Sequence, residues 1–388
     1  MRGCCPAAPP CAGSVHSFDG VSRRAGGVSG ASRVQPQRAG VRRVLEQISG
    51  QWSVSWSIVA FVLAGAVTVV CGIRLTALGD TLADRTGWGE ALFGAVFFGL
   101  ATSLSGIVMT GVSAADGHPQ LAYGNAVGGI AAQTLAVVVA DAAYRGVNLE
   151  HAASSSQNLL FGCLLLALLG IALMASLGPQ VTILGLHPAS AVLVAVYLGA
   201  LRLIHSRELP LWRAVRTRDT VADVPDESPS FPERRTGSLW AEFAGLAAVV
   251  VVGGWSVARA AESLVAATGL NAGLVGGVFM GVVNALPETV TAIAAVRRGA
   301  VTLAIAAVIG GNCLDVLNLV VGDAAYRDGS LYGAAGSDQL FMTSGSLVMT
   351  AVLLAGLLVR QRRGWLRLGF DGILLITVYV VIVVALAV

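Results

Sequence analysis

Glu288 is the side chain most able to do chemistry in a largely apolar sequence. It follows Pro287 inside one long apolar run. Asn312 and Asp315 lie in the next apolar run, three residues apart and so on one face of a helix. An ionisable side chain at bilayer depth costs free energy and is usually kept for a function. Because carboxylate and amide oxygens suit hard cations better than transition metals, these residues predict a cation site with Glu288 supplying charge.

Pro287 predicts how the backbone could add further oxygens to this site. Proline has no amide hydrogen, and its ring clashes with the carbonyl four residues earlier. We therefore expect the helix to break within residues 284–286 and to free carbonyl oxygens beside Glu288. Irregular backbone at bilayer depth is tolerated where it lines a cavity.

The composition identifies the surroundings of these residues as a membrane. The 388 residues are 55% hydrophobic and 12% charged, with a mean hydropathy of +0.75. These values are typical of an all-α polytopic membrane protein. The net charge of +3 is too small to indicate a nucleic-acid partner, so the expected partners are inorganic cations and the lipid bilayer. The six cysteines form no metal-binding pair, and no cofactor is expected.

Ten apolar stretches are long enough to cross a bilayer as helices. Residues 1–50 are predicted to be a disordered basic tail, and residues 205–237 a polar linker that separates five helices (51–204) from five more (238–388). The predicted helices cover 54–76, 89–114, 119–141, 158–176, 180–204, 239–258, 271–296, 300–322, 341–360 and 366–387.

The two halves repeat each other in sequence. Shifting the chain by 182 residues aligns 86–145 with 268–327 and gives 22 identities in 60 positions, including an Asp-Ala-Ala-Tyr-Arg pentapeptide that ends at Arg145 and again at Arg327. Five predicted helices separate the two pentapeptides, so they must lie on opposite sides of the membrane. The repeat is therefore inverted, an arrangement typical of secondary transporters.

Arginines indicate the orientation of the chain. Most short-loop arginines, such as Arg297 and Arg360, fall on one face of a ten-helix path, together with most of the central linker. Positive residues favour the cytoplasmic side, so we assign this face to the cytoplasm of a multi-pass protein in the cell membrane. The arginines of the N-terminal tail fall on the other face and conflict with this assignment.

The motif around Glu288 resembles a known family. Gly281-x-x-Asn-Ala-Leu-Pro-Glu288 followed by Gly310-Gly-Asn-x-x-Asp315 is similar to the second alpha-repeat of the cation/Ca²⁺ exchanger superfamily, which includes sodium/calcium exchangers. The segment Gly99-x-x-Thr-Ser-Leu-Ser-Gly106 resembles the first alpha-repeat. The resemblance implies an antiporter with ten helices in two inverted five-helix halves and alternating access.

The resemblance also implies which residues bind the ion. By position, Glu288 and Asp315 would be the metal-binding carboxylates, and the other ion-binding residues would be Asn312, Asn284, Ala285, Thr102 and Ser103. Thr102 and Ser103 would offer hydroxyl and carbonyl oxygens, and Asn284 and Ala285 mainly carbonyls.

The first repeat departs from the family pattern. Ser105-Gly106 stands where Pro-Glu is expected, and Gln133 stands opposite Asp315, so this half of the site has no carboxylate. Two carboxylates can balance one Ca²⁺, or can cycle between monovalent cations and protons. Exchange of Ca²⁺ or another cation against Na⁺ or H⁺ therefore stays open.

A cation antiporter is the favoured function. The alternative is a transport-inactive paralogue or membrane scaffold of the same fold, because loss of the first-repeat glutamate could abolish ion cycling. An enzyme is disfavoured, since the sequence shows no zinc-protease HExxH, no nucleophile elbow and no intramembrane aspartyl pair.

Overall fold

The computed structural model describes residues 52–86, 99–144, 147–153, 155–205, 234–297, 301–362 and 368–388. The N-terminal tail and most of the linker lie outside these ranges. The helices are α2 (Val54–Thr86), α3 (Gly99–Ala115), α4 (Pro119–Ala143), α5 (Leu149–Ala152), α6 (Ser156–Leu177), α7 (Pro188–His205), α8 (Thr236–Thr268), α9 (Ala272–Leu274), the π-helix η2 (Val275–Met280), α10 (Gly281–Arg297), α11 (Val301–Ala325), α12 (Ser337–Val359) and α13 (Phe370–Ala387).

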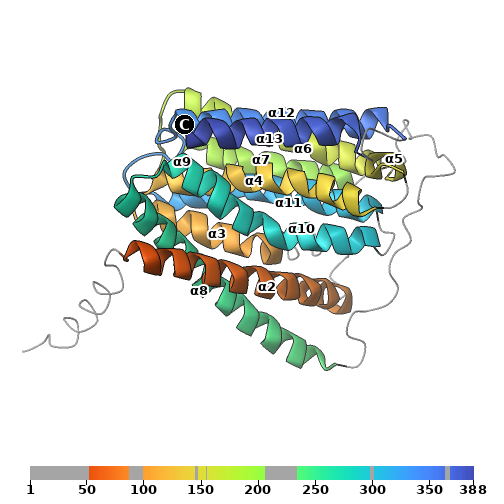
Figure 1. The fold of residues 1–388 in the computed structure, drawn as a ribbon, viewed down its shortest axis with the longest axis horizontal. Helices are drawn as coiled ribbons and strands as arrows, with labels where there is room; N and C mark the ends of the chain where they lie inside the picture. The colour runs from red at the N-terminus through yellow and green to blue at the C-terminus, as the bar shows by residue number, and fades with distance from the viewer. Residues whose placement is uncertain are drawn as a thin grey trace, which may run out of the picture. The chain divides into compact units, whose positions relative to one another are not determined.

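The predicted helical membrane fold is confirmed. Eight helical spans in the described ranges are long and apolar enough to cross a bilayer, the fifth of them running from Ala272 to Arg297 through α9, η2 and α10. The described parts of α3 and α7 form two shorter apolar helices. Figure 1 shows most of the helices running along a common direction and α8 running obliquely to them, with α5 at one end of the bundle and α9 at the other.

One predicted helix starts later than expected. The apolar run from residue 180 was predicted to be helical, but α7 begins at Pro188. Residues 183 and 186 instead form an isolated bridge around a tight turn in which Leu184 and Gly185 have positive φ. A proline fits the first turn of a helix, where an amide hydrogen is not needed, so the helix starts there rather than within the preceding apolar residues.

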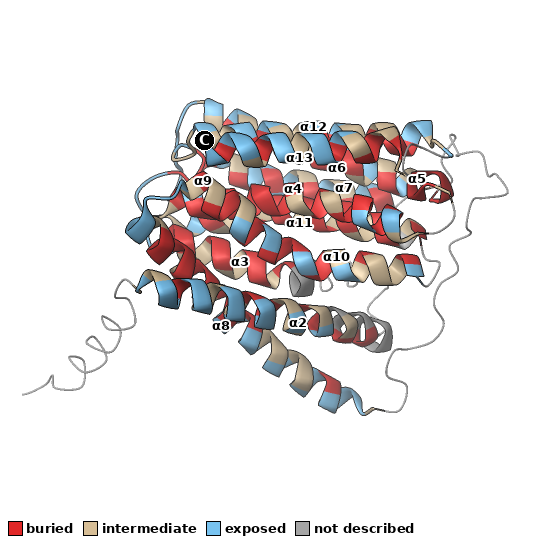
Figure 2. Cartoon of the chain, in the orientation of Figure 1, coloured by how far each residue is buried: buried red, intermediate tan, exposed pale blue. Residues whose placement is uncertain are grey.

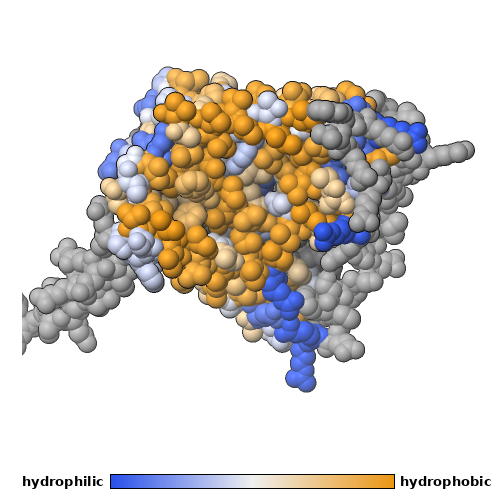
Figure 3. All heavy atoms as spheres, viewed as in Figure 1, coloured by the Kyte–Doolittle hydropathy of each residue, from blue (hydrophilic) through white to orange (hydrophobic). Residues whose placement is uncertain are grey.

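Burial divides the helices into a central group and a peripheral group. α4 is buried along most of its length and packs against α10, α11, α12 and η2. α2 and α8 pack closely on each other and are exposed along much of their outer faces, as Figure 2 shows. Hydrophobic residues cover the middle of the visible surface, and hydrophilic residues gather toward the two ends of the bundle (Figure 3). Exposed apolar side chains in such a band match the hydrocarbon core of a bilayer.

The sequence repeat has a counterpart in hydrogen bonding. The carboxylate of Asp141, near the end of α4, accepts from the Leu149 backbone N–H at 2.7 Å. The carboxylate of Asp323, near the end of α11, accepts from the Leu331 N–H at 3.0 Å. Each aspartate thus binds the amide eight residues ahead. The aspartate of each repeated pentapeptide therefore forms a hydrogen bond to the loop that follows its helix.

Candidate cation site

Glycines allow α4 to cross the π-helix and α10 with the backbones in contact. A Cβ placed on Gly128 would overlap the carbonyl of Gly277, and one on Gly281 would lie 2.6 Å from the Gly128 carbonyl carbon. A Cβ on Gly124 would lie 3.1 Å from the Gly277 nitrogen. Small residues of this kind let membrane helices approach closely. The crossing brings the polar residues of α4 beside those of α10.

The expected helix break within residues 284–286 is wrong. α10 continues from Gly281 to Arg297 through Pro287, and the Ala285 carbonyl accepts the Thr289 hydroxyl at 2.8 Å. A proline removes only one ladder bond, here the bond to the Val283 carbonyl, and membrane helices tolerate that loss where neighbouring groups compensate. The irregular backbone lies earlier, in the π-helix of residues 275–280. π-helical turns inside α-helices occur frequently at functional sites.

Asp315 is fully buried and accepts three amide N–H groups. Gln133 Nε2 donates to Oδ2 at 2.5 Å, and Asn284 Nδ2 donates to the same oxygen at 3.2 Å. Asn318 Nδ2 donates to Oδ1 at 3.1 Å. Hydrogen bonds to an ionised acceptor are the stronger kind, so these donors stabilise a negative charge on Asp315.

Asn284 and Asn318 fill the space that an acid in the first repeat would need. A Cβ on Gly106 would lie 2.5 Å from Asn284 Oδ1 and 2.9 Å from Asn318 Nδ2. The Ser105 hydroxyl donates to the same Asn284 oxygen at 3.4 Å. The missing glutamate at position 106 therefore leaves no void, because two amide side chains from the second half replace it.

Glu288 lies next to the side-chain oxygen of Gln133, which lacks a hydrogen-bond donor. Its side chain is buried, at 3% exposure. A Cβ on Gly311 would lie 3.8 Å from Glu288 Cγ and 3.2 Å from Gln133 Oε1, so these two side chains border the same glycine. Gln133 Oε1 and Asn312 Oδ1 are buried without a hydrogen-bond partner, while Asn312 Nδ2 donates to the Thr134 hydroxyl at 3.1 Å. Such oxygens fit a hard cation.

The structure thus brings Glu288, Asp315, Asn312 and Asn284 together between α4, α10 and α11. Ser103 is buried on α3, and its hydroxyl lies close to Asp315 without making a hydrogen bond of good geometry. Thr102 belongs to α3, but its side chain lies outside the described residues.

Sequence reasoning did not place Gln133 in the site, whereas a structural hydrogen bond between Asp315 and Asn318 was an alternative interpretation of Asp315. Gln133 and Asp315 are 182 residues apart, which is the repeat offset, and they touch each other. Equivalent residues that touch lie at the pseudo-two-fold axis between the halves. The repeat alignment contained this pairing, and the pairing was the signal that could have placed Gln133 in the site.

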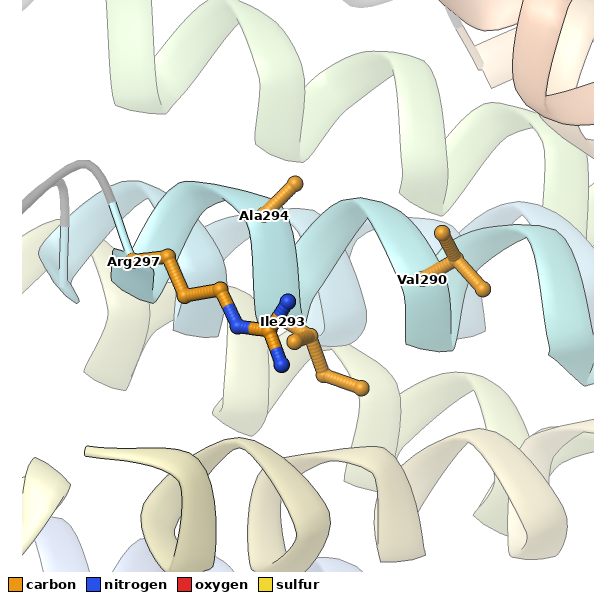
Figure 4. Close-up of a pocket in the computed structure, with 4 residues that line it drawn as sticks. All are labelled: Val290, Ile293, Ala294 and Arg297. Atoms are coloured by element: carbon orange, nitrogen blue, oxygen red, sulfur yellow. The ribbon is translucent and has the colours of Figure 1, made fainter.

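A surface groove near the end of α10 is separate from this site. It has a volume of about 500 Å³ and is lined by Val290, Ile293, Ala294 and Arg297. Figure 4 shows these four side chains on the last turns of the helix. Val290 is two residues from Glu288, or roughly 200° around the helix, so the groove lies on the opposite face. The described residues contain no group of three or more His, Cys, Asp or Glu arranged to hold a metal.

Comparison with known proteins supports the same architecture. A family model described as "Sodium/calcium exchanger protein" matches residues 56–204 and 238–388. A search of curated proteins finds no match to the chain.

Solved structures of exchangers are similar to this fold at low sequence identity. The H⁺/Ca²⁺ exchanger CAX is 15% identical with a TM-score of 0.61, covering 85% of each chain. Native YfkE is 14% identical with a TM-score of 0.59, covering 90% of this chain and 98% of that one. The sodium-calcium exchanger NCX_Mj, soaked with 2.5 mM Na⁺ and 0.1 mM Sr²⁺, is 16% identical with a TM-score of 0.55, covering 86% and 99%.

Proposed function

Because the chain belongs to the sodium/calcium exchanger family and is a multi-pass membrane antiporter of cations, we propose that its transported cation binds between α4, α10 and α11. The observation that carries this proposal is the buried Glu288 side chain beside the Gln133 amide oxygen, which has no hydrogen-bond donor. A buried oxygen without a donor is costly, and a cation removes that cost.

The two carboxylates have different roles in this proposal. Asp315 is a fixed charge, because Gln133, Asn284 and Asn318 already donate to its oxygens. Glu288 is the carboxylate that exchanges one cation for another. Together they balance one Ca²⁺, and Glu288 alone balances one monovalent cation or a proton.

The remaining site residues support this centre. Asn284 holds Asp315 and fills the space next to Gly106. The Ser103 hydroxyl, buried on α3, offers a further oxygen. The transported pair is Ca²⁺ or another cation against Na⁺ or H⁺, moved across the cell membrane with the arginine-rich end of the bundle in the cytoplasm. The linker at 205–237 joins a half at 51–204 to a half at 238–388.

Transport by purified protein in vesicles tests the proposal. Radiolabelled Ca²⁺ and Na⁺ are followed under an imposed Na⁺ gradient and, separately, an imposed H⁺ gradient. We expect uptake that depends on one of the gradients and is lost in Glu288→Gln, which keeps the side-chain size but removes the charge.

Asp328→Asn is the matched control, because Asp328 is exposed in the loop after α11. It should transport like wild type. Full activity of Glu288→Gln would overturn the site. Absence of cation flux under every gradient would instead favour the transport-inactive paralogue, for which the missing first-repeat acid is the supporting observation.

A further inference from the structure

The two equivalent aspartates of the inverted repeat, Asp141 and Asp323, have surroundings that differ in charge. At the end of α11, the Asp323 carboxylate meets neutral donors. The His187 backbone N–H and the Ser190 hydroxyl each donate to Oδ2 at 2.8 Å, in addition to the Leu331 N–H on Oδ1. This aspartate is buried with its hydrogen bonds made.

At the end of α4, the equivalent aspartate faces two more acids. Glu150 occupies the repeat position of Tyr332, and Asp371 occupies that of Ala189. Asp141, Glu150 and Asp371 are all buried, at 4%, 3% and 2% exposure. Three ionised carboxylates in one buried space would repel one another strongly.

The unsatisfied atoms of this group show what it lacks. Glu150 Oε2 and Asp371 Oδ2 are buried without a donor, although the two side chains lie within hydrogen-bonding reach of each other. Asn148, at 4% exposure, has a buried Nδ2 without an acceptor. A Cβ on Gly369 would contact both this nitrogen, at 2.9 Å, and Asp371 Oδ1, so the amide points into the group. A proton on Glu150 would give Asp371 its missing donor.

We propose that Glu150 and Asp371 share one proton at neutral pH and form a proton-binding site at the end of α4, separate from the cation site. Burial, followed by the charges of Asp371 and Asp141, raises the pKa of Glu150 well above its usual range.

Three basic residues lie near this site, and hydrogen bonds to backbone groups connect them to each other and to Asn148. Arg360, at the end of α12, donates from Nη2 to the His151 carbonyl at 2.7 Å. His151 Nδ1 lies 2.7 Å from the Arg360 carbonyl, and the Asn148 N–H donates to the Arg362 carbonyl at 3.2 Å. These bonds join the α4–α6 connection to the segment before α13. The shared proton adds a side-chain link between α5 and the first turn of α13.

The stability of the folded protein should therefore depend on pH. Because the folded-state pKa of Glu150 is raised, its stabilising contribution is complete below the ordinary value of 4.5 and is lost as pH rises through the raised value. Thermal unfolding of the full chain in lipid nanodiscs should show a midpoint that falls over this range. Glu150→Gln, which keeps a hydrogen-bond donor without titrating, should flatten that fall and should unfold at a higher temperature than wild type at alkaline pH.

Infrared difference spectra detect the protonated carboxyl group directly. A purely structural role of Glu150 would not produce a change in this band. Wild type should show a protonated carboxyl band at neutral pH that Glu150→Gln lacks. Asp371→Asn removes a neighbouring charge, so the band should disappear at a lower pH than in wild type. Asp328→Asn, in the corresponding loop of the second repeat, should leave the spectrum unchanged.

Transport separates this site from the cation site. Glu150→Gln should retain gradient-driven uptake, because the variant preserves the proton-bound arrangement and leaves Glu288 intact. An unchanged carboxyl band or an unchanged pH profile of unfolding in Glu150→Gln would overturn the shared proton. Loss of uptake in a folded Glu150→Gln would overturn its separation from the transport cycle.

Discussion

Gly106 determines how the cation site is filled at the level of single residues. A side chain there would collide with Asn284 and Asn318. Gly106→Ala should lower stability by about 1–3 kcal/mol, the usual cost of overpacking a well-packed core. Thermal unfolding measures this change. Gly170→Ala is the matched control, because a Cβ there has nothing within 4 Å. Equal unfolding temperatures of the two variants would show that the Asn284 and Asn318 side chains do not pack against Gly106.

Asp315 gives a second prediction at this scale. In Asp315→Asn, one of the three amide donors loses its acceptor, because the new NH₂ group cannot accept a hydrogen bond. A buried donor without an acceptor costs about 1–3 kcal/mol. The unfolding temperature should fall well below that of the exposed variant Asp328→Asn. If the variant were as stable as wild type, the hydrogen bonds of these amides would not require the Asp315 carboxylate.

At the scale of the elements, the crossing of α4 with the π-helix determines whether the site forms. Gly128→Ala would push a methyl group into the Gly277 carbonyl, where backbone rather than a flexible side chain is in the way. We expect loss of folded protein or loss of transport. Gly199→Ala on α7 should have little effect, because its Cβ would meet nothing within 4 Å. Size-exclusion profiles and vesicle uptake compare the two variants, and similar results would contradict the close crossing.

The elements were largely predictable because lipid imposes a simple rule on them. Stretches such as 119–141 and 300–322 had to be helices, since only helices satisfy their own backbone groups in a bilayer. The π-helix at 275–280 was not predictable from Pro287, which the helix tolerates further along. The fit of Asn284 against Gly106 depends on two helices 178 residues apart (284 minus 106) and is not encoded in local periodicity.

At the scale of the whole molecule, the inverted repeat predicts opposite exposure of equivalent loops. Asp328 follows α11, and Arg362 lies beside the corresponding loop after α4. In a background without native cysteines, Asp328→Cys and Arg362→Cys should react with an impermeant thiol reagent from opposite sides of a sealed vesicle. Labelling from the same side would contradict the ten-crossing topology.

The contact between Gln133 and Asp315 has a consequence for how such a chain can diverge. A residue on the two-fold axis of a homodimer meets its own copy, so an acid there would face an identical acid. Once both halves belong to one chain, each position on the axis can change alone. An amide can then donate to a carboxylate where two identical side chains would otherwise repel each other. When the two halves belong to one polypeptide, the ion site can be asymmetric, with an amide on one side of the axis and a carboxylate on the other. Two identical subunits could not form such a site.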